Sequence, residues 1–101
     1  MEKIEEKYTA ASFLQNALQH LQDRAATYDN PQGERSIGKT VDMFNTMTGH
    51  NLTEEQGWKF MALLKLVRSE QGEYKADSYE DGSAYIALAG ESASQRKQAK
   101  S

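Results

Sequence analysis

The chain contains a single proline, Pro31, among its 101 residues. Proline breaks a helix when it stands inside one, so the long stretches on either side of Pro31 are free to form uninterrupted helices. Apolar residues in these stretches recur at about 100° of rotation per residue, which is the period of an α-helix. We therefore predict an all-α fold, a small bundle of about four helices. The predicted helices cover residues 9–28, 36–48, 54–68 and 77–89.

Turn and capping signals mark the ends of these helices. The segment 28–33 stacks turn-forming residues around the proline and ends the first helix. Gly49 is expected to cap the second helix at its carboxyl end. Residues 53–56, with the sequence Thr-Glu-Glu-Gln, form a capping box at the start of the third. Gly90 is expected to end the fourth helix.

Length and composition limit the fold and its partners. One domain, residues 1–90, is all that a chain of this length supports, and residues 91–101 lack large apolar side chains, so we expect a disordered C-terminal tail. The chain has no cysteine, which excludes disulfides and thiolate-bound metals. It has neither an apolar signal segment nor a run long enough to span a membrane. A net charge of -3 gives the chain no bulk attraction to nucleic acid. We expect a cytoplasmic protein with no membrane partner.

Charged residues of the third and fourth helices are harder to explain in a plain bundle. Lys65 and Arg68 are three residues apart and project from neighbouring positions. Asp77 and Asp81 share a face of the next helix, and the following turn of that face presents Tyr85, which should point inward. Because the link between the two helices is short, we expect these side chains to meet at one corner of the fold.

Two interpretations of this corner are open. In the structural one, Lys65 and Arg68 neutralise Asp77 and Asp81, because an unpaired buried charge is costly, and Tyr85 adds a hydrogen bond. In the functional one, the basic pair binds the phosphate oxygens of a nucleotide. The two carboxylates then hold a divalent cation, Mg²⁺.

The loop that contains Pro31 combines an aromatic residue, charges of both signs and turn formers. Loops of this composition are usually solvated connections. In a functional interpretation the loop forms a binding lip beside the charged corner, to which Arg24, Tyr28 and Arg35 contribute. The candidate ligand-binding residues are Arg24, Tyr28, Lys65, Arg68, Asp77, Asp81 and Tyr85, with Asp77 and Asp81 as candidate magnesium ligands.

Three short motifs follow one another over roughly residues 20 to 90: Arg24-x-x-x-Tyr28 before the turn, Lys65-x-x-Arg68, and Asp77-x-x-x-Asp81-x-x-x-Tyr85. As an ordered set they resemble a group of small uncharacterised phage and prophage proteins. The resemblance implies a phage-encoded protein in the cytoplasm of the host cell. It implies no activity.

The acidic residues also give a more distant likeness. Asp77 with Glu80, or with Asp81, resembles one of the carboxylate pairs of the MazG-type all-α nucleoside triphosphate pyrophosphohydrolases. That likeness implies two carboxylate pairs that bind magnesium and support attack by water. Glu54 and Glu55 are adjacent and diverge by about 100° around a helix, so they do not match the other pair.

Other residues support no further site. With no cysteine and only two histidines, His20 and His50, we do not expect a zinc site. The third helix is nearly apolar all round, which is typical of a central helix, and Trp58 is expected in the core. An exposed Trp58 would indicate a protein partner or self-association.

Two functions therefore stay open. The first is a phage-type accessory protein that acts by binding, either to a host protein or to itself as a homo-oligomer. The second is a nucleotide-binding protein related to the MazG-type enzymes that uses the charged corner, with magnesium. We favour the first and do not expect an enzyme, because the carboxylate set for hydrolysis is incomplete.

Overall fold

A computed structural model describes residues 8–27 and 36–100 of the chain, and all of its regular structure in these ranges is α-helical. The predicted all-α, four-helix fold is confirmed. The proline loop, residues 28–35, lies outside the described residues, and with it the candidate residues Tyr28 and Arg35. In the part of the chain that the structure describes, no helix is long and apolar enough to cross a lipid bilayer. The helices are α1 (Ala10–Thr27), α2 (Ser36–Thr48), α3 (Glu54–Ser69) and α4 (Ala76–Lys100).

The predicted caps of α2 and α3 are present. Thr53 Oγ1 accepts a hydrogen bond from the Gln56 backbone N–H at 3.1 Å, and Gln56 Oε1 accepts one from the Thr53 N–H at 2.9 Å. This reciprocal pair satisfies donors that would otherwise be unpaired at the start of α3. Gly49 follows α2 with a φ of 79°, the left-handed conformation that glycine adopts without steric cost.

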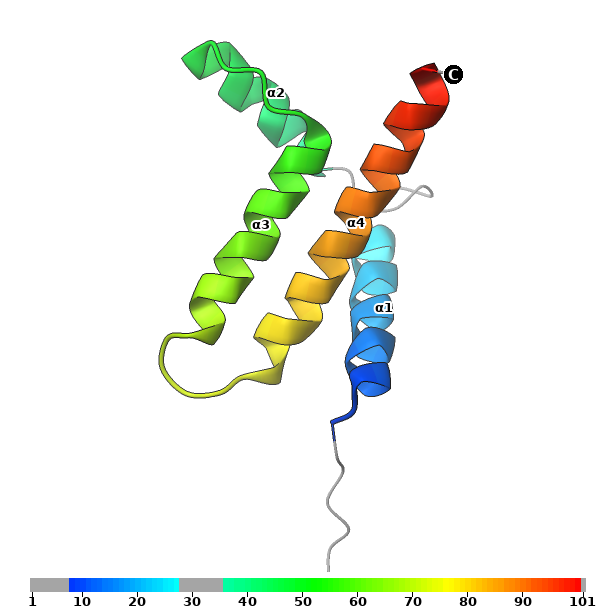
Figure 1. The fold of residues 1–101 in the computed structure, drawn as a ribbon, viewed down its shortest axis with the longest axis vertical. Coiled ribbons are helices and arrows are strands. Elements are labelled where there is room, and N and C mark those ends of the chain that lie inside the picture. The colour runs from blue at the N-terminus through cyan, green and yellow to red at the C-terminus, as the bar shows by residue number, and fades with distance from the viewer. Residues whose placement is uncertain (1–7, 28–35, 101) are drawn as a thin grey trace, which may run out of the picture.

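The central helix is α4, and the prediction that the third helix occupies the centre is wrong. Figure 1 shows α3 and α4 as an antiparallel hairpin, with α1 packed on the other side of α4. Ala84 and Ala89, both buried, give α4 the small surface that lets helices approach closely from two sides. One side of α3, by contrast, is not covered by the described chain, and Phe60 is 68% exposed there.

The predicted end of α4 at Gly90 is also wrong. The helix continues through Gly90 to Lys100, so residues 91–100, which were expected to belong to a tail, extend the helix. A glycine inside a helix costs only about 1 kcal/mol relative to alanine. Beyond it, Arg96 donates to Glu55 Oε1 of α3 at 2.6 Å and so joins the far end of α4 to the start of α3. Ser101 lies outside the described residues.

The hydrophobic core is small and lies between α3 and α4. Trp58 is 2% exposed, as predicted, and its ring stacks on Tyr85 with 5.8 Å between the ring centroids. In the part of the chain that the structure describes, four of the eight buried apolar residues are alanines. The buried cluster consists of Trp58, Ala62, Tyr85, Leu88 and Ala89, with Leu21, Ile37 and Met61 packed against it.

Among the described helices, α2 packs only on α3, and Figure 1 shows it leaning away from the other two. The contact is made at Gly57 of α3. A Cβ atom at this position would lie 2.6 Å from Val41 Cγ2 and 3.1 Å from Ile37 Cγ1. Gly57 therefore sets how closely α2 approaches α3.

Candidate functional site

The charged corner forms around Asp81, whose carboxylate lies between α1 and α3. Lys65 Nζ is 3.1 Å from Asp81 Oδ2, and an Arg24 guanidinium nitrogen is 3.8 Å from Oδ1. His20 Nε2 is 3.9 Å from the same Oδ1. The Asp81 side chain is 16% exposed. The basic groups from two other helices offset the free-energy cost of burying its charge. The structure thus brings together Arg24, Lys65 and Asp81.

Tyr85 lies one turn farther along α4 and takes part in the corner through its ring. The Arg24 guanidinium carbon is 4.9 Å from the centroid of that ring, a cation–π distance. The Tyr85 ring also stacks on Trp58 of the hydrophobic core. Arg24 therefore connects the charged corner to the hydrophobic core.

A second buried carboxylate belongs to Glu80, which the sequence analysis names only as a possible pair with Asp77. It is 6% exposed, accepts a hydrogen bond from Asn16 Nδ2 at 2.7 Å and lies 3.1 Å from His20 Nε2. Asn16, His20 and Arg24 are spaced four residues apart, so they form one polar stripe along α1. That spacing was the available signal. It shows a polar stripe but not which helix the stripe faces.

Arg68 and Asp77 line a more open part of the corner. They border a polar pocket of about 410 Å³ that also extends over the α3–α4 link. Its three cationic and three anionic side chains balance, so the pocket has no excess positive charge with which to attract a phosphate. Its lining residues are Lys65, Arg68, Gln71, Glu73, Lys75, Asp77, Ser78 and Asp81.

The predicted magnesium ligands were Asp77 and Asp81. Within the described residues, the group whose ligand atoms all lie within 4.8 Å of one another is His20, Asp77 and Glu80. Asp77 therefore converges with Glu80 and a histidine. Magnesium prefers an all-oxygen set, whereas this group supplies one nitrogen and two carboxylates, and Glu80 is already engaged by Asn16 and His20.

At the opposite end of the α3–α4 hairpin, Glu55 holds two cations. Lys59 Nζ lies 2.7 Å from Glu55 Oε2, and an Arg96 guanidinium nitrogen lies 2.6 Å from Oε1. The hydrogen bond from Lys59, followed by that from Arg96, lowers the pKa of Glu55 below its ordinary value of 4.5.

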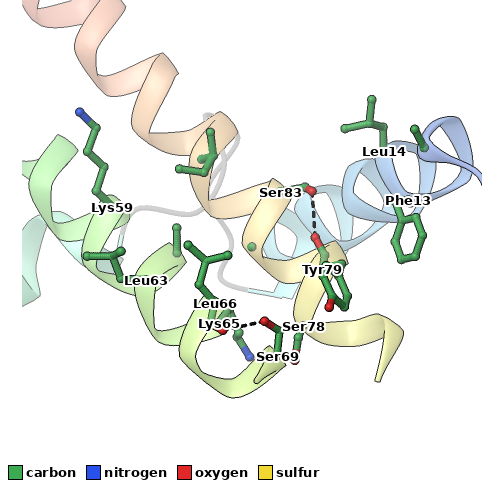
Figure 2. A pocket seen from close by; sticks show the side chains of 14 residues that line it. Phe13, Leu14, Lys59, Leu63, Lys65, Leu66, Ser69, Ser78, Tyr79 and Ser83 are labelled. Atoms are coloured by element: carbon green, nitrogen blue, oxygen red, sulfur yellow. Dashed lines mark hydrogen bonds between the residues drawn. The ribbon is translucent and has the colours of Figure 1, made fainter. Parts of the chain in front are cut away.

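An apolar groove of about 730 Å³ lies on another face of α4, between α1 and α3. Figure 2 shows Leu63 and Leu66 on the α3 side, Tyr79 and Ser83 on α4, and Phe13 on the α1 side. The groove runs along the helices because α1 and α3 both pack on α4 but not on each other.

The groove continues onto exposed apolar side chains of the neighbouring helices. Eight large apolar residues of α1, α3 and α4 are each between 43% and 68% exposed, and five of them line the groove. Helical spacing places those of α3 on one continuous arc that runs from the groove to its outer side. We call this surface the apolar face; it consists of Leu14, Leu18, Phe60, Leu63, Leu66, Val67, Tyr79 and Ile86.

A protein-family model described as a domain of unknown function, DUF6378, matches residues 12–93. The chain belongs to this family. Comparisons with curated proteins and with solved structures give no significant match. The DUF6378 match includes all of α2 and α3 and most of α1 and α4. Both the charged corner and the apolar face therefore lie within the DUF6378 region.

In this DUF6378 chain the charged corner and the apolar face differ in how far residues of the same chain pair or cover their side chains. The Glu80 and Asp81 carboxylates of the corner are paired with side chains from α1 and α3. The apolar face has no comparable cover in the described chain. The sequence analysis missed this face because it interpreted the nearly apolar third helix as a central helix covered by its own chain.

Proposed function

We propose that this DUF6378 protein acts by binding a protein partner on its apolar face, and not by catalysis. The observation that carries the proposal is the 730 Å³ groove together with the exposed apolar side chains that extend it. Single exposed apolar residues are normal on a protein surface, but a contiguous patch of this kind marks an interaction site.

The shape of the groove indicates what kind of partner it accepts. α1 and α3 form the walls of the groove and α4 forms its floor. Gly82 lies in this floor and has no side chain to fill the groove. An amphipathic helix fits a groove of this kind by inserting side chains at positions i, i+3, i+4 and i+7. We therefore propose a partner that presents an apolar helix.

The charged corner has a structural role in this proposal. Asp81 is within 4 Å of basic groups of Lys65, Arg24 and His20, and Glu80 is bonded to Asn16. A phosphate that bound Lys65 or Arg24 would have to displace a carboxylate already in place. The corner thus supports the packing of α1 and α3 on α4.

The resemblance to small phage and prophage proteins supports an accessory role in the cytoplasm of a host cell. An accessory protein of this type acts on a host protein or on another copy of itself, and both agree with an apolar binding face. We therefore propose that the protein acts in the cytoplasm of a host cell.

A peptide-binding experiment tests the proposed function. The probe is a fluorescent amphipathic peptide of about four helical turns, with leucines on one face and alternating glutamate and lysine on the other. At protein concentrations low enough for the groove to be free, we expect the wild-type protein to raise its anisotropy. Leu66→Lys, inside the groove, should abolish the rise, and Met47→Lys, exposed on α2 outside the apolar face, should preserve it. A wild-type protein that stays a single chain and leaves the anisotropy unchanged contradicts the proposal.

Nucleotide binding at the corner is the second candidate, and the polar pocket bordered by Arg68 and Lys75 would be its site. A ligand that binds only the folded protein raises the melting temperature as its concentration increases. We expect ATP, GTP, dUTP and their diphosphates, with or without magnesium, to leave the melting temperature unchanged. A concentration-dependent rise that Arg68→Ala removes would establish the nucleotide function instead.

A further inference from the structure

We infer that the occupant of the apolar face is a second copy of this chain, which makes the protein a dimer with two-fold symmetry. The inference rests on the proposed function, since it names the partner of the same face. Three properties of the face support it: its area, its shape and its charge.

The area agrees with a stable dimer. If a partner covered these eight partly exposed residues completely, each chain would bury at most roughly 800 Å² there, which is about what each partner buries in an interface of standard size. Burial of this surface would also cover the side of α3 that the described chain leaves open. The apolar stretch of α3 would then be enclosed, as its sequence predicts.

The shape of the face is complementary to itself. Phe60, Leu63 and Val67 follow a three-then-four spacing, so they form one ridge along α3. The groove between α1 and α3 lies beside this ridge. In a two-fold dimer each surface meets its own copy, so the ridge of each chain can enter the groove of the other. Such a reciprocal contact closes at two chains.

The charge of the face permits two identical surfaces to meet. Lys59 and Lys65 are the charged residues that line the groove. Each is bonded within its own chain, Lys59 to Glu55 at 2.7 Å and Lys65 to Asp81 at 3.1 Å. A strongly charged face would repel its copy and would select a partner of opposite charge. The apolar face is not strongly charged, so it neither repels its own copy nor selects a partner of opposite charge. A second copy is therefore favoured over a charged partner.

Sedimentation velocity tests the inference on the full chain. Over about a hundredfold range of concentration, the wild-type mass should rise from the 11.4 kDa of one chain to twice that value. Leu66→Lys on α3 and Leu14→Lys on α1 should remain single chains with unchanged helical circular dichroism, because both residues are more than half exposed. Met47→Lys, the matched control on α2, should dimerise like the wild type.

Alkylation of single cysteines gives a readout that does not need a disruptive variant. The chain has no cysteine, so Leu63→Cys introduces a unique thiol in the face and Met47→Cys one outside it. With excess iodoacetamide, the rate at residue 63 should fall several-fold as protein concentration increases, and the rate at residue 47 should stay constant.

Four results overturn the inference: a wild-type mass of one chain at every concentration, a species larger than two chains, dimers of both face variants, or equal alkylation of residue 63 at all concentrations. The peptide experiment separates this failure from that of the proposed function. A single-chain protein that still binds the amphipathic peptide in its groove contradicts only the second-copy inference. A single-chain protein that binds no peptide contradicts both.

Discussion

At the scale of single residues, the neighbouring carboxylates Glu80 and Asp81 join three helices. Glu80 is buried against Asn16 and His20 of α1, and Asp81 bonds Lys65 of α3 as well as α1. A buried carboxylate costs several kcal/mol unless it is paired, so each of these contacts offsets a large penalty. The two residues therefore specify how α1 and α3 sit on α4.

Removing the Glu80 carboxylate should destabilise the fold. Glu80→Ala leaves the Asn16 amide and the His20 ring without their acceptor in a partly buried site, which costs about 2 kcal/mol in the free energy of unfolding. Urea denaturation followed by circular dichroism measures it. Glu73→Ala, an exposed carboxylate in the α3–α4 link, serves as control and should change stability by less than about 0.5 kcal/mol. Equal stability of the two variants would contradict the structural role of Glu80.

At the scale of elements, the α3–α4 hairpin is the base on which the other two helices pack. α1 is attached to it by a mixed apolar and polar seam, and α2 only by a close crossing at Gly57. The far end of the hairpin is joined by the bonds of Glu55 to Lys59 and Arg96. These attachments differ in chemistry, so single substitutions can test them separately.

Gly57→Ala should loosen α2. Because the added Cβ would lie 2.6 Å from Val41 Cγ2, α2 must move outward, at a cost of about 1–3 kcal/mol in the free energy of unfolding. Urea denaturation gives the loss of stability, and hydrogen exchange of α2 shows where it occurs.

Gly90→Ala is the control for Gly57→Ala. Gly90 also lies in a helix, but no atom outside its own helix lies within 4 Å of an added Cβ. Alanine should stabilise the protein there by up to about 1 kcal/mol. Destabilisation by both substitutions, or by neither, would contradict the close α2–α3 crossing.

The bonds of Glu55 should make the far end of the hairpin sensitive to acid. Because the pKa of Glu55 is lowered in the folded chain, its contribution to stability is complete above the ordinary value of 4.5 and is lost as the pH falls through the folded pKa. We expect Glu55→Gln to be less stable than the wild type near neutral pH, with a difference that shrinks as the pH falls below 4.5. Urea midpoints of both proteins measure this, and a difference independent of pH would contradict it.

At the scale of the whole molecule, local features of the sequence predicted the helices and one contact between them. Periodicity and caps are local, and the short link made Lys65 and Asp81 neighbours. The sequence did not show that the polar stripe of Asn16 and His20 contacts α4, because α1 and α4 are distant in sequence. The apolar face was also missed, since an apolar stretch such as that of α3 looks the same whether its own chain or a partner covers it.

The described chain leaves several of its large apolar side chains exposed. Half of its buried apolar residues are alanines, while larger side chains such as Phe60 and Leu66 are exposed. In our account a second copy completes the core, so association and folding are linked. A polar substitution on the apolar face should then remove the dimer but leave the single chain as stable as before, within about 0.5 kcal/mol.

The most direct test of this account is the melting temperature as a function of protein concentration. If two copies complete the fold, the wild-type melting temperature rises with concentration, because mass action stabilises the dimer. Leu66→Lys should melt at one temperature at all concentrations, equal to that of the wild type at high dilution. A wild-type melting temperature independent of concentration, or a Leu66→Lys protein that retains the wild-type rise, would contradict it.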